Sequence, residues 1–244
     1  MRETSLHQRF PATRWSAIRA SAEADAVTRE QGFSRVIAAY WRPIYVYLRL
    51  RHRRSDADAH DLTQGFFADC WERNTFASFD PARARFRTFV RTCLDRFAVD
   101  EHRSAHAQKR GGERKHVPID LAQLESDTAL TDPALSSDPE RLFEAEWVRS
   151  LLQQALTELR TSYASQSRDL DLALFEAYEL GASERPSYAQ LADRHGVPVT
   201  TVTNRLAAVR RALRACLAKN LREITSTEEE YREESFRVFG VRPE

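Results

Sequence analysis

The sequence predicts an all-α protein with two helical domains joined by a linker. Its 244 residues include only seven glycines, and its apolar residues recur with helical rather than alternating spacing. Hydrophobic residues make up 42% of the chain, enough to bury packed cores. The expected parts are a flexible lead (1–13), an N-terminal helical domain (14–104), a linker (105–138), a C-terminal helical domain (139–222) and an acidic tail (223–244).

Two long helices are expected first. Apolar residues at i, i+3, i+4 and i+7 predict a helix from Phe33 to Leu50, with Pro43 inside it. Ser55 or Asp56 can cap the next helix, which runs from about Ala57 to Arg73.

A loop at residues 74–83 follows these helices. Proline favours the first turn of a helix, so Asp80-Pro81 predicts the start of the third helix. Asp138-Pro139 opens the C-terminal domain in the same way, and a further helix is expected around Leu170–Leu180.

The segment from Ser187 to Leu206 predicts a helix-turn-helix. Ala192 is small enough to let a second helix cross the first, and Gly196 suits the tight turn between them. Apolar side chains then fill the seam between the helices: Val197, Val202 and Leu206.

The second helix of this motif carries a polar, cationic face of the kind that reads the major groove. The residues expected to contact base edges are Thr200, Thr201, Thr203, Asn204 and Arg205. The residues expected to contact phosphates, or simply to solvate the helix, are Arg210, Arg211, Arg214 and Lys219. The sequence therefore predicts a DNA-binding protein.

Charge alternates along the chain, although the net charge is only +1. Residues 83–115 carry ten Lys/Arg against four Asp/Glu, whereas residues 120–146 carry eight acids and one base. Residues 199–222 hold six Lys/Arg and no acid, and residues 223–235 hold six acids and one base. This alternation indicates two cationic surfaces for DNA, separated and followed by acidic segments.

Other classes of protein find little support. Cys70, Cys93 and Cys216 are far apart, so we expect neither a zinc site nor a disulfide framework, and neither metal nor cofactor. The chain has no run of 18 apolar residues and no leader-like segment, which predicts a cytoplasmic protein without a membrane partner. It also has no nucleophile motif, phosphate loop or metal-spaced cluster, so we do not expect an enzyme.

Two further strings add a family resemblance. Residues 58–71 read DAHDLTQGFFADCW and residues 86–91 read FRTFVR. Together with the helix-turn-helix, they resemble the sigma-70 family of bacterial transcription initiation factors, specifically the extracytoplasmic-function (ECF) type. The resemblance covers roughly residues 10–220. It implies a sigma-2 region, a linker and a sigma-4 region.

The resemblance implies binding to core RNA polymerase at its β′ clamp and β flap. Three residues match the clamp-binding motif: Asp58, Asp61 and Gln64. Asp61 and Gln64 are three residues apart and share a helix face, where they can accept hydrogen bonds from a basic partner. The alternative is an ordinary solvated helix face.

The motif departs from the family at His60, where a glutamate is expected. Thr63 lies three residues on, and its phosphorylation would more than replace the missing charge. We hypothesise that a Ser/Thr protein kinase or another regulator activates polymerase binding through Thr63. The alternative is an unmodified helix-surface residue.

The resemblance also assigns promoter contacts. The sigma-2 region would bind the −10 element through the loop residues Asn74, Phe76, Ser78 and Phe79 and the helix residues Arg83, Arg85, Arg87, Thr88 and Arg91. The sigma-4 helix at Val199–Leu213 would read the −35 element. The acidic tail could fold back on a basic DNA face, bind a regulator or be disordered, with disorder the default. The alternative function is a stand-alone helix-turn-helix regulator with a helical effector domain.

Overall fold

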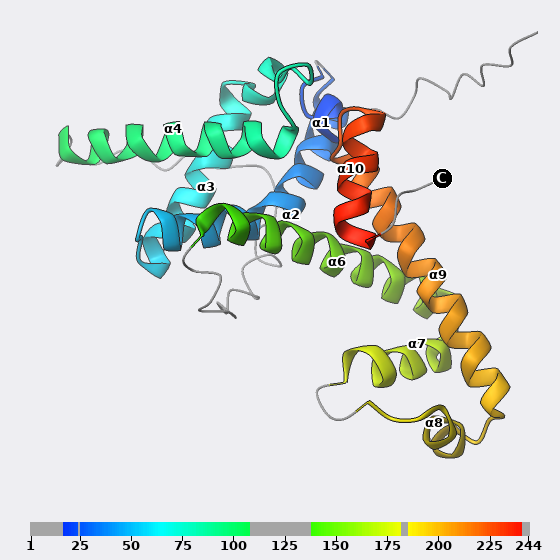
Figure 1. Cartoon of the computed structure of the whole chain (residues 1–244). Coiled ribbons are helices and arrows are strands. Elements are labelled where there is room, and N and C mark those ends of the chain that lie inside the picture. Colours follow the sequence, from blue (N-terminus) through cyan, green and yellow to red (C-terminus); the bar gives the residue numbers. More distant parts are fainter. Residues whose placement is uncertain (1–16, 24, 108–137, 182–184, 241–244) are drawn as a thin grey trace, which may run out of the picture. The chain divides into compact units, whose positions relative to one another are not determined.

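A computed structural model describes residues 17–23, 25–107, 138–181 and 185–240. Within these ranges all regular structure is helical, which confirms the all-α prediction (Figure 1). The chain forms two compact units. Unit 1 holds the residues up to Ser150 together with those from Leu221 onward, and unit 2 holds Leu151–Asn220. The expected lead and nearly all of the expected linker lie outside the described residues.

Unit 1 takes helices from both halves of the chain. They are α1 (Ala17–Ala20), α2 (Ala26–Arg51), α3 (Asp56–Glu72), the short 3-10 helix η1 (Thr75–Ser78), α4 (Phe86–Ala107), the first part of α6 (Pro139–Ser165) and α10 (Glu228–Phe239). The compact unit is therefore larger than the expected N-terminal domain, because residues beyond the expected linker join it.

Helix α2 supplies much of the core of unit 1. Its N-terminus is capped by Asp25, whose carboxylate accepts the backbone N–H of Thr28 at 2.8 Å. The buried ring of Trp41 stacks on Phe67 of α3, with ring centroids 6.0 Å apart. The buried Tyr40 meets Phe86 of α4 edge-on at 5.7 Å. Aromatic packing thus joins α2 to both α3 and α4.

The prediction that Asp80-Pro81 opens a helix is wrong. The carboxylate of Asp80 accepts the N–H of Ala82 at 3.0 Å, and its backbone carbonyl accepts the N–H of Arg83 at 3.1 Å. These bonds close a turn, and α4 begins only at Phe86. Aspartate followed by proline favours a β-turn as much as a helix start, so the dipeptide alone does not separate the two.

The default expectation of a disordered tail is also wrong. Glu228–Phe239 forms α10, and the Thr227 side chain caps it by accepting the N–H of Glu230 at 3.0 Å. Tyr231 and Ser235 on this helix are buried in unit 1. The tail as far as residue 240 is therefore part of the folded unit.

Unit 2 contains the rest of α6 and the remaining helices, namely α7 (Asp169–Phe175), the π-helical turn η3 (Glu176–Leu180), α8 (Tyr188–His195) and most of α9 (Val199–Glu223). One apolar cluster holds them together, with Leu174, Leu191 and Val209 fully buried. The helix expected around Leu170–Leu180 is thus present as α7 and η3.

The helix-turn-helix prediction is confirmed. Ser187 and Gln190 form a reciprocal capping box at the start of α8. Gly196 ends α8 with a φ of +62°, a conformation that residues with a Cβ rarely adopt. Val202 and Leu206 of α9 are fully buried in the seam between the two helices.

The expectations about membrane spans, metal sites and cysteines can be compared with the structure only for the described residues. No helix there is long and apolar enough to cross a membrane. No group of three or more His, Cys, Asp or Glu side chains is placed to hold a metal in the same ranges. Cys70 is buried, Cys93 and Cys216 are half-buried, and all three are free thiols.

We predict that Gly32→Ala destabilises unit 1. A Cβ at Gly32 in α2 would lie 2.4 Å from the backbone nitrogen of Ser21 and 2.6 Å from the carbonyl carbon of Ala20. Because backbone rather than a flexible side chain is in the way, we expect a loss of about 1–3 kcal/mol in unfolding free energy. Urea denaturation measures it.

The matched control is Gly65→Ala in α3. There the added Cβ meets only the tip of the Phe97 ring, at 3.3 Å, and alanine favours the helix. We expect little loss, and equal destabilisation by both variants would contradict the close approach of α1 to α2.

Candidate nucleic-acid and polymerase interfaces

The second helix of the helix-turn-helix presents a short polar face. Thr200, Thr203 and Asn204 of α9 are exposed, whereas Thr201 is half-buried. The exposed amide of Asn204 can both donate and accept, while the Thr203 hydroxyl donates to the Val199 carbonyl at 3.1 Å. Three of the five residues expected at base edges are therefore openly accessible.

Arg205, the fifth of these residues, is engaged inside unit 2. Its guanidinium pairs with one carboxylate oxygen of Asp171 on α7, and Arg168 pairs with the other at 2.6 Å. Asp171 is only 3% exposed, so the two arginines neutralise a buried carboxylate. Arg205 thus orients α9 against α7, a role that the sequence analysis missed because Asp171 is distant in sequence.

The arginines farther along α9 fall into two groups. Arg210 pairs with Glu179 of η3 at 2.6 Å and lies over the Tyr178 ring, 5.4 Å from its centroid. Arg211 and Arg214 are exposed and make no ion pair within the described part of the chain. These two remain open for phosphate contacts, whereas Arg210 is held by its own unit.

The acidic motif of α3 lies partly in solvent. Ser55 caps the helix by accepting the N–H of Asp58 at 3.1 Å. Asp58 and Asp61 are exposed, and Gln64 is half-buried. His60 packs against the Tyr45 ring at 4.6 Å between centroids. The exposed part of the motif therefore consists of its two aspartates.

The expectation that Thr63 lies on the helix surface is wrong. Its side chain is fully buried, and its hydroxyl donates to the carbonyl of Ala59 at 2.7 Å. Thr63 shares one helix face with Phe66, Phe67 and Cys70, which all pack into the core. A kinase cannot reach this hydroxyl in the folded unit, so the structure does not support Thr63 as a phosphorylation site.

The expected base-binding loop contains η1. Asn74 directly precedes η1 and has a φ of +50°, a left-handed conformation that asparagine tolerates better than most residues. Phe76 is buried between Phe33 and Phe86, at 5.4 Å from each, so it packs in the core rather than standing free for a base. Ser78 is exposed, and Phe79 is half-buried against Phe86.

A hollow of about 440 Å³ opens beside this loop. Phe76 and Phe79 line it from the loop side, and Ile18 and Ala22 line it from α1 and the residues just after it. Its volume is in the range of small-ligand pockets. Arg19, Glu23 and Ser226 also line it, so the recess combines aromatic walls with polar groups.

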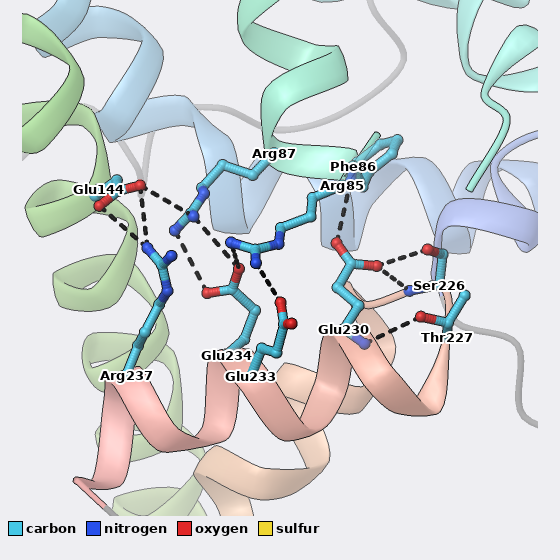
Figure 2. A network of polar contacts seen from close by, with 10 residues as sticks. All are labelled: Arg85, Phe86, Arg87, Glu144, Ser226, Thr227, Glu230, Glu233, Glu234 and Arg237. Atoms are coloured by element: carbon cyan, nitrogen blue, oxygen red, sulfur yellow. Dashed lines mark hydrogen bonds and ion pairs between the residues drawn. The ribbon is translucent and has the colours of Figure 1, made fainter. Parts of the chain in front are cut away.

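The arginines around the start of α4 are mostly engaged within unit 1 (Figure 2). Arg87 pairs with Glu144 of α6 at 3.0 Å and with Glu234 of α10 at 3.3 Å. Arg85 pairs with Glu233 of α10.

Farther along α4, Arg91 pairs with Glu140 of α6 at 3.1 Å. By contrast, the Arg83 side chain is 86% exposed, with Asp80 as its local partner, and Thr88 is exposed. Of the five helix residues expected to bind the −10 element, only these two are open. The charge alternation along the sequence was the signal that acidic segments could cover this basic stretch.

These features define the class of the protein. A capped helix-turn-helix with an exposed polar face on its second helix is typical of DNA-binding transcription proteins. The sequence model described as "ECF sigma factor" matches residues 15–219, and the chain therefore belongs to the ECF sigma factor family. It is thus a sigma factor that directs transcription. No curated protein and no solved structure gave a match.

We predict that Asp171→Asn loosens the helix-turn-helix unit. The change leaves Arg168 and Arg205 without their shared carboxylate, and charged hydrogen bonds of this kind contribute about 1.5–3 kcal/mol. Both arginines are partly exposed, so we expect a loss at the lower end of that range. Thermal unfolding followed by circular dichroism measures it.

Asp169→Asn is the matched control, because Asp169 lies on the same helix and is exposed. A loss that is no larger for Asp171→Asn than for Asp169→Asn would contradict the role of this buried carboxylate.

Proposed function

We propose that this sigma factor assembles with core RNA polymerase in the cytoplasm and gives it promoter choice at two DNA elements. The observation that carries the proposal is the exposed polar face of α9, formed by Thr200, Thr203 and Asn204 on a helix held in a helix-turn-helix. Helices of this kind enter the major groove and read base edges. In the ECF resemblance, this element is the −35 reader.

The −10 element would meet unit 1. The hollow beside η1 has aromatic walls, and stacking on aromatic rings is the usual way to hold an unpaired base. Arg83 and Thr88 are exposed at the same end of α4 and can contact the backbone of the strand. We propose that a −10 base enters the hollow lined by Phe79, while Phe76 forms its floor as part of the core.

The polymerase contact would be made by α3. Asp58 and Asp61 expose two carboxylates, and Gln64 lies on the same helix face as Asp61. Carboxylates on a rigid helix suit arginine-rich partners such as the β′ clamp. The sigma-4 region (139–222), most of which lies in unit 2, would engage the β flap. The family resemblance supports both contacts, and the exposure of the acidic pair supports the clamp contact.

We predict that Asn204→Ala changes promoter choice, because a base contact by a side-chain amide contributes about 1–3 kcal/mol of discrimination. Arg211→Ala should instead weaken all promoters alike and lower the salt slope by roughly 0.9 for the one phosphate that its guanidinium would neutralise. Holoenzyme transcription from a library of −35 sequences, repeated at several salt concentrations, measures both effects. The reverse pattern would refute this division between base and phosphate contacts.

We predict that Asp61→Arg weakens assembly with core RNA polymerase at least tenfold, which corresponds to about 1.4 kcal/mol. Asp100→Arg on α4 is the control, because Asp100 is exposed but lies outside the motif. Competition for core polymerase against a labelled reference sigma factor measures the affinity. Equal binding by both variants would remove α3 as the contact. Tight duplex binding without polymerase would favour a stand-alone regulator.

A further inference from the structure

Helix α10 lies beyond the part of the chain that matches the family, which ends at residue 219. Its first turn holds three glutamates, and two more follow at positions 233 and 234. Three of these five acids point toward the start of α4 (Figure 2). The contacts all fall within unit 1, so they belong to one compact body.

Glu230 caps α4. Its carboxylate accepts the backbone N–H of Phe86, the first residue of α4, at 3.1 Å. The other carboxylate oxygen accepts the N–H and the hydroxyl of Ser226 at 2.7 and 2.6 Å. An anion here satisfies a backbone donor that the helix leaves free and faces the positive end of the helix dipole.

Glu233 and Glu234 occupy the neighbouring arginines. Glu234 is only 2% exposed and lies within 3.3 Å of Arg87 and 3.7 Å of Arg85. Glu233, which is more exposed than Glu234, pairs with Arg85. Arg237 reaches across to Glu144, which also holds Arg87. The acids of α10 therefore fill a site made from one helix N-terminus and two guanidinium groups.

A helix N-terminus beside two arginines is suited to phosphate. Thr88, Thr92 and Arg96 follow along α4 at i+4 spacing, and all three are exposed. Arg83 adds an exposed cation just before the helix. Two exposed arginines and two hydroxyl groups spread along this stretch fit the repeated phosphates of a nucleic-acid strand better than a single small ion.

The contact between Glu234 and the arginines of α4 has features that favour its replacement by another anion. Burial raises the pKa of the Glu234 carboxyl above its ordinary value, although Arg87, Arg237 and Arg85 oppose the shift. One oxygen of this carboxylate makes no hydrogen bond, even though both guanidinium groups are near it. Buried ion pairs contribute little net stability, because desolvation offsets their attraction. A phosphate that took the place of these carboxylates would keep both guanidinium groups paired, which avoids the cost of leaving a buried charge alone.

We propose that α10 occupies a phosphate-binding site on unit 1 and competes there with the DNA backbone, which makes the C-terminal helix an internal inhibitor of DNA binding. The inference rests on the proposed function, because it takes α4 as a DNA-binding helix. In the closed form, Arg85 and Arg87 are bound by α10. In the DNA-bound form, phosphates take the place of Glu233 and Glu234.

The test uses the full chain and a labelled 20-nucleotide single strand of mixed sequence, followed by fluorescence anisotropy between 50 and 300 mM salt. Glu233→Gln with Glu234→Gln keeps the shape of α10 but removes its charge toward the arginines. Release of two arginines should steepen the salt slope by about 1.4, at roughly 0.7 per phosphate on single strands. The affinity at 50 mM salt should rise about tenfold.

Glu228→Gln with Glu229→Gln is the matched control. It removes the same two charges from exposed positions of the same helix, so it corrects for the general change in net charge. Addition of Arg85→Gln and Arg87→Gln to the active variant should return the slope to that of the unmodified chain. Glu233→Gln alone, at a half-exposed position, should give a smaller gain and guards against misfolding of the double variant.

The possible failures can be told apart. If the unmodified chain and every variant lack salt-dependent binding, the DNA-binding function itself fails. If the unmodified chain binds and the Glu233/Glu234 variant matches the Glu228/Glu229 control, α10 is not an inhibitor. Weaker binding by the Glu233/Glu234 variant would also overturn the proposal, because it would make α10 a support for α4.

Discussion

The packing around Phe86 is the constraint on which unit 1 depends. Its ring contacts Tyr40 of α2, Phe76 of η1 and the neighbouring Phe79, at 5.7, 5.4 and 5.1 Å. Its backbone N–H is held by Glu230 of α10. One residue thus connects α2, the η1 loop, α4 and the C-terminal helix. Arg85 and Arg87, which both pair with acids of α10, directly flank this residue in the chain.

Much of the fold was predictable because local patterns control it. The spacing of apolar residues predicted both ends of α3 to within one residue, and it predicted α2 apart from the stretch between Ala26 and Phe33. Gly196 with its apolar flanks predicted the helix-turn-helix. The family resemblance assigned Asp58 and Asp61 to a binding motif on α3, and both side chains are exposed. In each case residues close in sequence decide the outcome.

The errors came from contacts between distant residues or from a helix face that was assigned wrongly. Thr63 was paired with His60, although its spacing from Phe66, Phe67 and Cys70 places it equally well on the apolar face. The partners of Arg85 and Arg205 lie 148 and 34 residues away, which no local pattern reveals. A basic side chain on a predicted helix can as readily bind its own protein as bind DNA.

The glycine at position 32 links two places that look independent. Without a side chain there, α1 approaches α2 until backbone nearly touches backbone, and Ile18 of α1 lines the recess beside η1 together with Ala22 just after that helix. A side chain at position 32 would therefore displace the segment whose residues Ile18 and Ala22 line that recess. In the proposed mode of −10 binding, a substitution at this buried glycine would reshape the base site without touching the nucleotide.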